Sequence, residues 1–244
     1  MIFLFLTIIF SLNLSAQDEN LDKLPFDDAP PGVEEEEYFV FGAGYGLAFN
    51  FTNIDNINSF TSNYNLESFP SPVVLKGGTM FTSLPWAGLR VSLWSLSGVS
   101  EMKNDSSFAS LSSSYFGLGV EYGYVIVKTL AIVGGINFSY SKNEFQLSNL
   151  VEERIIWDDK EVASQVLLIK KEKNSFWPDL YSPNLGIEWA ITDFLMFRFN
   201  VAYNYSFGYD EWTVNNLETT NIFKGVDNDG LAVSAGLFIG LFNY

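Results

Sequence analysis

Large apolar residues alternate with smaller or polar residues along several segments of the chain. In residues 195–207, LMFRFNVAYNYSF, every odd position is large and apolar or aromatic, and every even position except Met196 is small or polar. A period of two residues is typical of a β-strand with two unlike faces. At about 3.3 Å per residue the segment extends roughly 40 Å, which crosses a hydrocarbon core of about 30 Å at a tilt of about 45°.

The same alternation predicts eight strands, at residues 38–51, 73–82, 87–96, 110–126, 130–141, 184–191, 195–207 and 231–244. The connections near residues 84, 128 and 193 are short, whereas those near 61, 102, 160 and 218 are long. Short turns at one rim and long loops at the other are typical of outer-membrane barrels, with the long loops outside the cell. Within the long connection 143–176, residues 161–169 fit either a short helix or an extra strand.

The second face of these strands distinguishes a membrane barrel from a soluble one. A soluble barrel such as a lipocalin exposes its polar face to water, and that face should carry charged residues. Here the second face is mostly Gly, Ala, Ser and Asn, as at Gly42, Gly44 and Gly46, and such residues suit a crowded interior. The aromatic face then points outwards, which only lipid accommodates on this scale. We predict an all-β, transmembrane antiparallel up-and-down β-barrel of eight strands, with ten strands as the alternative.

The N-terminal residues predict two segments outside the barrel. Residues 1–16 are apolar and end in small residues, which indicates a cleaved secretory signal peptide, with a membrane anchor as the alternative. Residues 17–37 are rich in Asp, Glu and Pro, a composition that cannot bury enough apolar surface to fold. We therefore expect a disordered periplasmic segment at 17–37, followed by the barrel at 38–244.

Composition narrows the classes of function. The net charge is −16 and no basic patch is present, which argues against a nucleic-acid partner. Cysteine is absent, so disulfides and thiolate metal sites are excluded. Histidine is also absent, which removes the side chain most often used for acid–base catalysis near neutral pH. We predict no enzymatic activity, no catalytic residues, no cofactor and no metal site.

Four charged residues fall on the inner faces of the predicted strands: Arg90, Glu121, Glu188 and Arg198. Each lies a few residues from a short turn, so all four are expected at a similar depth. Glu188 and Arg198 should lie opposite each other and Arg90 should lie near Glu121, with Lys76 joining from higher up. The expected result is a buried ionic network that fills the lumen, and the alternative is a gate or selectivity ring.

One loop motif resembles the start of a calcium-binding loop. Residues 227–230, Asp-Asn-Asp-Gly, lack the spacing of the remaining ligands and the closing Glu. A turn from loop to strand is the preferred interpretation.

The chain resembles the small bacterial outer-membrane β-barrels of the OmpA and OmpX type. The resemblance covers residues 38–244 and rests on the signal peptide, the alternating segments, the loop lengths and the terminal Tyr244. Members of that group commonly end in an aromatic residue that the barrel-assembly machinery reads. Their pattern would place Phe238, Phe242 and Tyr244 outwards. The upstream run Leu231, Val233, Leu237, Ile239 and Leu241 favours the opposite phase, so both phases stay open.

These observations together predict a monomeric protein of the bacterial outer membrane, with its N-terminal segment in the periplasm. The expected role is structural or surface-presenting, through loops 52–72, 142–176 and 208–229. A narrow pore for small solutes and an accessory subunit of an envelope secretion or assembly machine are the alternatives. The expected partners are outer-membrane lipids, the barrel-assembly machinery during biogenesis and an extracellular ligand.

Overall fold

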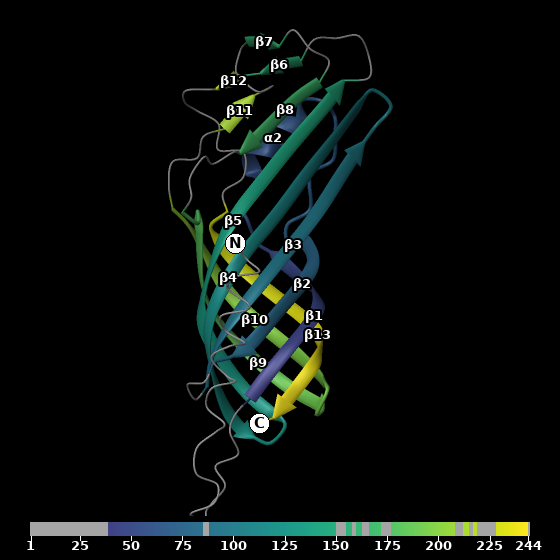
Figure 1. The fold of residues 1–244 in the computed structure, drawn as a ribbon. Helices are drawn as coiled ribbons and strands as arrows, with labels where there is room; N and C mark the ends of the chain where they lie inside the picture. Colours follow the sequence, from purple (N-terminus) through teal and green to yellow (C-terminus); the bar gives the residue numbers. More distant parts are fainter. Residues whose placement is uncertain are drawn as a thin grey trace, which may run out of the picture. The chain divides into compact units, whose positions relative to one another are not determined.

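Figure 1 shows the chain as a computed structural model, which divides into two units, Met1–Glu35 and Glu36–Tyr244. The structure describes residues 39–84, 88–149, 155–157, 160–162, 166–171, 177–207, 212–214, 217–218 and 228–243. The predicted signal peptide and the predicted periplasmic segment lie outside these residues, and everything described below belongs to the second unit.

Eight of the described strands close into an antiparallel barrel (Figure 1). Their order around the barrel is β1–β2–β3–β4–β5–β9–β10–β13, and the pairing of β13 with β1 closes the ring. The strands are β1 (Phe39–Asn50), β2 (Val73–Ser83), β3 (Leu89–Lys103), β4 (Ser107–Val127), β5 (Leu130–Asn149), β9 (Leu180–Thr192), β10 (Leu195–Ser206) and β13 (Gly230–Asn243). The predicted all-β, eight-stranded barrel is confirmed, and the ten-stranded alternative is wrong.

One end of the barrel carries the short turns after β2, β4 and β9, and we call it the short-turn rim. Phe39 of β1 pairs with Asn243 of β13, so the first and last barrel strands also meet at this rim. At the opposite end β3, β4 and β5 continue past their neighbours, and we call it the extended rim (Figure 1).

The extension of β3, β4 and β5 corrects the predicted loops. Residues 97–107 and 143–149 were expected as loops, yet β3 reaches Lys103, β4 begins at Ser107 and β5 reaches Asn149. The extended sheet also includes β8 (Val166–Lys171), β11 (Trp212–Val214) and β12 (Leu217–Glu218), while β6 (Ile155–Trp157) pairs with β7 (Lys160–Val162). Of residues 161–169 the structure describes 161–162 and 166–169, and for these the strand alternative is the correct one.

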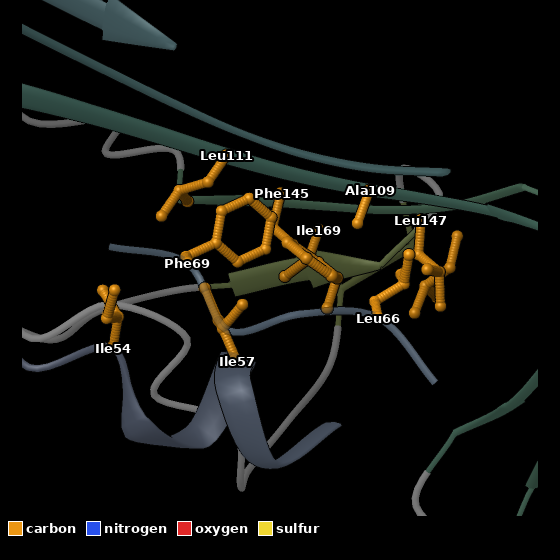
Figure 2. Packing of buried hydrophobic residues seen from close by; sticks show 10 residues of the cluster. Ile54, Ile57, Leu66, Phe69, Ala109, Leu111, Phe145, Leu147 and Ile169 are labelled. Carbon is orange, nitrogen blue, oxygen red and sulfur yellow. The ribbon is translucent and has the colours of Figure 1, made fainter. Parts of the chain in front are cut away.

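A short helix, α2 (Asp55–Ser62), covers one face of the extended sheet, where a loop was expected (Figure 2). The buried cluster between them takes residues from α2 and its flanks and from β4, β5 and β8, each at most 7% exposed: Ile54, Ile57, Leu66, Phe69, Ala109, Leu111, Phe145, Leu147, Leu167 and Ile169. We call this cluster the cap core. Fully burying a Leu, Ile or Phe side chain stabilises by about 1.5–3 kcal/mol, so the cap core fixes the helix against the strands.

None of the helices in the described residues has the length and apolarity needed to cross a membrane.

The two faces of the barrel strands follow the predicted alternation. On β4 the outward side chains are 46–64% exposed: Phe116, Leu118, Val120, Tyr122, Tyr124 and Ile126. On β13 the structure decides between the two phases that the sequence left open, because Leu237, Ile239 and Leu241 face outwards whereas Phe238 and Phe242 are only 5% exposed. The pairing of β13 with β1 runs without a register shift, so no bulge changes this phase.

Candidate functional site

The structure brings the four predicted inner charges together inside the barrel near the short-turn rim. Arg90 lies on β3, Glu121 on β4, Glu188 on β9 and Arg198 on β10, and each is at most 7% exposed. Strand β5 lies between β4 and β9 and contributes small residues, with Gly135 paired to Glu121 and Ala131 paired to Glu188. A Cβ atom on Gly135 would meet the backbone and side chain of Glu121, so this glycine leaves the room that the charges occupy.

Lys76 does not join this cluster, which corrects the sequence-based expectation. On β2 the even positions face outwards and the odd positions face inwards, as the exposed Lys76 and Met80 and the buried Leu75 and Phe81 show. The sequence of β2 has apolar residues and glycines on both faces, so its alternation did not fix the phase.

The shortest ionic hydrogen bonds of the cluster cross the lumen. Arg90 donates from Nη1 and Nη2 to Glu188, at 2.8 and 2.6 Å, and from Nε to Glu121 at 3.0 Å. Arg198 donates from both terminal nitrogens to Glu121, one of them at 3.1 Å. Its contact with Glu188, the neighbour expected to be its partner, is longer, at 3.6 Å between Nη1 and Oε1.

This crossed pairing follows from the length of the arginine side chain. Arg198 and Glu188 are register partners, and so are Arg90 and Glu121. Cβ atoms of directly opposite residues lie only about 4.5–5.5 Å apart, so an extended arginine reaches past its neighbour to a carboxylate on the far wall. Two guanidinium groups and two carboxylates balance in charge, and shared bidentate bonds offset the cost of removing them from water.

Aromatic rings fill the short-turn end of the lumen beside this cluster. Phe81, Phe238 and Phe242, which we call the aromatic plug, have ring centroids 5.4 Å apart for Phe81–Phe238 and 6.5 Å for Phe81–Phe242. The Arg90 guanidinium lies 4.9 Å from the centroid of the Phe81 ring. A Cβ atom on Gly42 would lie 3.0 Å from the Phe242 ring, so the inner-face glycine makes space for the plug, as the sequence predicted.

A cavity of about 130 Å³ lies within the lumen. Glu121 and Arg198 contribute to its lining, as do Trp94, Asn137 and Asn200. Trp94 Nε1, Asn137 Oδ1 and Asn200 Oδ1 are buried atoms with no hydrogen-bond partner among the described residues. Polar atoms of this kind hold ordered water in protein interiors, and a cavity of this size accommodates several molecules.

Hydrogen-bonded amides and hydroxyls fill the lumen toward the extended rim. Asn204 donates to Asn50 at 3.0 Å, and Asn50 donates to the Tyr115 hydroxyl at 3.1 Å. Tyr115 in turn donates to Asn228 at 3.0 Å, and Asn143 donates to the same oxygen of Asn228 at 2.9 Å. We call these five residues the asparagine lattice. The alternation along their strands predicts inner-face positions for Asn50 and Asn204, whereas no sequence pattern indicates that Asn228, from a long loop, is buried here.

Residues 228–230 of the Asp-Asn-Asp-Gly motif form the entry into β13. The Asp229 carboxylate accepts hydrogen bonds from the backbone N–H and the hydroxyl of Ser206, and Gly230 has a φ of +149° that favours glycine. Asp227 lies outside the described residues. Within the described part of the chain, Asp and Glu side chains do not gather in groups of three or more that would hold a metal ion.

No protein-family model matches the chain, and no curated protein matches it. Among solved structures, the chain is similar to the crystal structure of Acinetobacter baumannii CarO. The two are 12% identical, the match covers 83% of this chain and 97% of that chain, and the TM-score is 0.39. A likeness of this degree carries no assignment of function or of residue roles.

Proposed function

We propose that the chain is an integral protein of the bacterial outer membrane. The observation that carries this proposal is the apolar outer face of the barrel, with six outward side chains of β4 that are 46–64% exposed. From Phe116 to Ile126 the strand advances about 23 Å along the membrane normal, taking ~3.3 Å per residue and a tilt of about 45°. Outer-membrane barrels have an apolar band of about 25 Å, and a water-soluble protein does not expose so large an apolar surface.

The outward side chains change from apolar to polar toward the extended rim. On β4 the outward positions beyond Phe116 are Ser114, Ser112 and Ser110, and on β5 the outward positions beyond Tyr140 are Lys142 and Glu144. These side chains suit water, so we place the extended rim outside the cell. The short-turn rim, where β1 begins and β13 ends, then faces the periplasm.

The role we propose is the presentation of a rigid surface to the exterior. The cap core joins α2 to β4, β5 and β8, so the described residues at this end of the molecule form a packed platform (Figure 2). A packed platform holds its surface side chains in fixed positions, which lowers the entropy cost of binding a partner.

Heating is expected to change the mobility of the protein on a denaturing gel. The unheated protein should run as a compact, fast band because the closed hydrogen-bonded barrel resists detergent, and the boiled protein should run more slowly because its chain is unfolded. Identical mobility with and without boiling would contradict the closed barrel.

Single cysteines are expected to report the orientation, because the chain has no cysteine of its own. Lys103→Cys, at the exposed end of β3, should react with a membrane-impermeant maleimide on intact cells. Lys128→Cys, in the short turn between β4 and β5, is the matched control and should react only after the outer membrane is permeabilised. The reverse pattern would place the extended rim in the periplasm and reject the proposed orientation.

The protein is not expected to conduct ions in a planar bilayer. The aromatic plug and the four-charge cluster fill the lumen near one rim, and the asparagine lattice fills it toward the other. Eight strands enclose little more space than side chains need. Discrete openings in single-channel recordings would favour the pore alternative instead, and a heat-denatured sample serves as the control for channel contaminants.

A further inference from the structure

A small polar patch interrupts the apolar outer face of β2 and β3. It consists of Lys76, Gly78, Ser95 and Ser97, all of them exposed, and we call it the polar notch. Lys76 pairs directly with Ser97, and Gly78 pairs with Ser95, so the four residues form one block across two adjacent strands.

On its β1 side the polar notch lies within the apolar belt, and on its β4 side it borders Ser114, the first of the polar outward positions of that strand. Lys76 is about 16 Å along the membrane normal from the end of β2 at Ser83, taking ~3.3 Å per residue and a tilt of about 45°. On the neighbouring strand Lys76 pairs with Leu47, and beyond Leu47 the exposed Phe49 and Phe51 continue the belt toward the extended rim. A lysine at this depth reaches toward the headgroups by extending its side chain along the barrel wall.

No carboxylate neutralises Lys76 among the residues that the structure describes. The outward residues that pair with the notch on the flanking strands are Tyr45 and Leu47 on β1 and Ser114 and Phe116 on β4. None of these four residues is acidic. An unneutralised ammonium group in a lipid-facing wall favours an anion supplied by the membrane itself.

Gly78 leaves one outward position beside Lys76 without a side chain, and we call this position the recess. The nearest atom to a Cβ built on Gly78 would be the backbone oxygen of Gly44 at 3.5 Å, so the position is open. The side chain of Tyr45, which pairs with Gly78 and is 59% exposed, borders the recess on one side. The recess can take the first part of an acyl chain while the charged group is held above it.

We propose that the polar notch binds the phosphate group of an anionic lipid in the outer leaflet. Lys76 supplies the positive charge, Ser95 and Ser97 supply hydroxyl donors, and the lipid chain lies along Gly78. Charge-assisted hydrogen bonds to phosphate are the stronger class of hydrogen bond, and the site opens toward lipid, which makes a membrane lipid the source of the phosphate. This inference rests on the proposed membrane location of the barrel and goes beyond it in naming a ligand.

The test uses the full chain in nanodiscs of phosphatidylcholine that contain a small fraction of phosphatidic acid. Native mass spectrometry counts the lipids that stay bound to the released protein. The wild-type protein should retain phosphatidic acid with about tenfold preference over phosphatidylcholine. Lys76→Met and the double variant Ser95→Ala/Ser97→Ala should lose most of this preference, and Lys76→Arg should keep it.

Lys103→Met is the matched control, because it removes an exposed lysine from β3 beyond the polar notch and should leave the preference unchanged. Equal retention by Lys76→Met and wild type would overturn the inference, as would competition by soluble glycerol 3-phosphate, which would point to a free phosphate ligand. The fast band of the unheated protein is recorded for every variant. Its absence in wild type would reject the barrel proposal itself, whereas its presence without lipid preference rejects only the polar notch as a lipid site.

Discussion

Replacing Arg90 with methionine is expected to lower the free energy of unfolding by about 3–5 kcal/mol. The substitution removes three ionic hydrogen bonds and leaves Glu188 and Glu121 buried without those donors. Breaking a buried ion pair from one side is costly because the remaining charge stays out of water. Urea unfolding of the detergent-folded protein, followed by tryptophan fluorescence and by the fast gel band, measures the change.

The double variant Arg90→Met/Glu188→Leu is expected to recover most of that loss. It removes the donor and its bidentate acceptor together and leaves the Arg198–Glu121 pair intact. Lys103→Met, at the exposed end of the same strand, should stay within about 0.5 kcal/mol of wild type. A double variant as unstable as the single variant would show that the loss comes from packing around Arg90 and not from unpaired charge.

Replacing Gly44 with valine is expected to prevent most of the protein from forming the closed barrel. A Cβ atom at this position would overlap the backbone oxygen of Leu237 and the ring of Phe238, at the seam where β1 pairs with β13. Overpacking costs about 1–3 kcal/mol when side chains can move, and more is expected here because backbone is in the way. The measurement is the fraction of refolded protein that runs as the fast band.

Gly134→Val is the matched control for this prediction. Gly134 lies on the outer face of β5, where the nearest atoms to a Cβ would be 3.7 and 3.8 Å away. The Gly134→Val variant should fold with the wild-type yield, because valine slightly stabilises a β-strand relative to glycine. If Gly44→Val also folded in the wild-type yield, the strands would have to separate more easily at the seam than the geometry indicates.

The sequence predicted the barrel well where the two faces of a strand differ most in chemistry. In β4 and β10 aromatic residues alternate with glycine, serine and asparagine, so the phase, the outward face and the inner position of Arg198 follow directly. In β2 the two faces are alike, and the expectation that a charged residue points inwards then placed Lys76 on the wrong side.

The extension beyond the barrel was missed for a different physical reason. The outer face of the extension carries small polar residues such as Ser110, and its inner face packs against α2 through residues such as Leu111. The difference in apolarity between the two faces is therefore smaller here than in the barrel. The helix itself left a weak signal in the spacing of Ile54, Ile57 and Phe60, a helical period within an Asn- and Ser-rich segment. The burial of Asn228 depends on contacts with β4 and β5 that are distant in sequence, which no local pattern encodes.

The crossed ion pairs bear on how the barrel closes during biogenesis. Arg90 and Glu121 belong to one hairpin, and Glu188 and Arg198 belong to another. Each hairpin therefore contributes one arginine and one glutamate to the lumen, so the inner charges of each hairpin sum to zero before the two walls meet. In the closed barrel Arg90 keeps its hydrogen bond to Glu121 and adds Glu188 from the other hairpin, so closure joins two neutral pairs into one four-charge cluster.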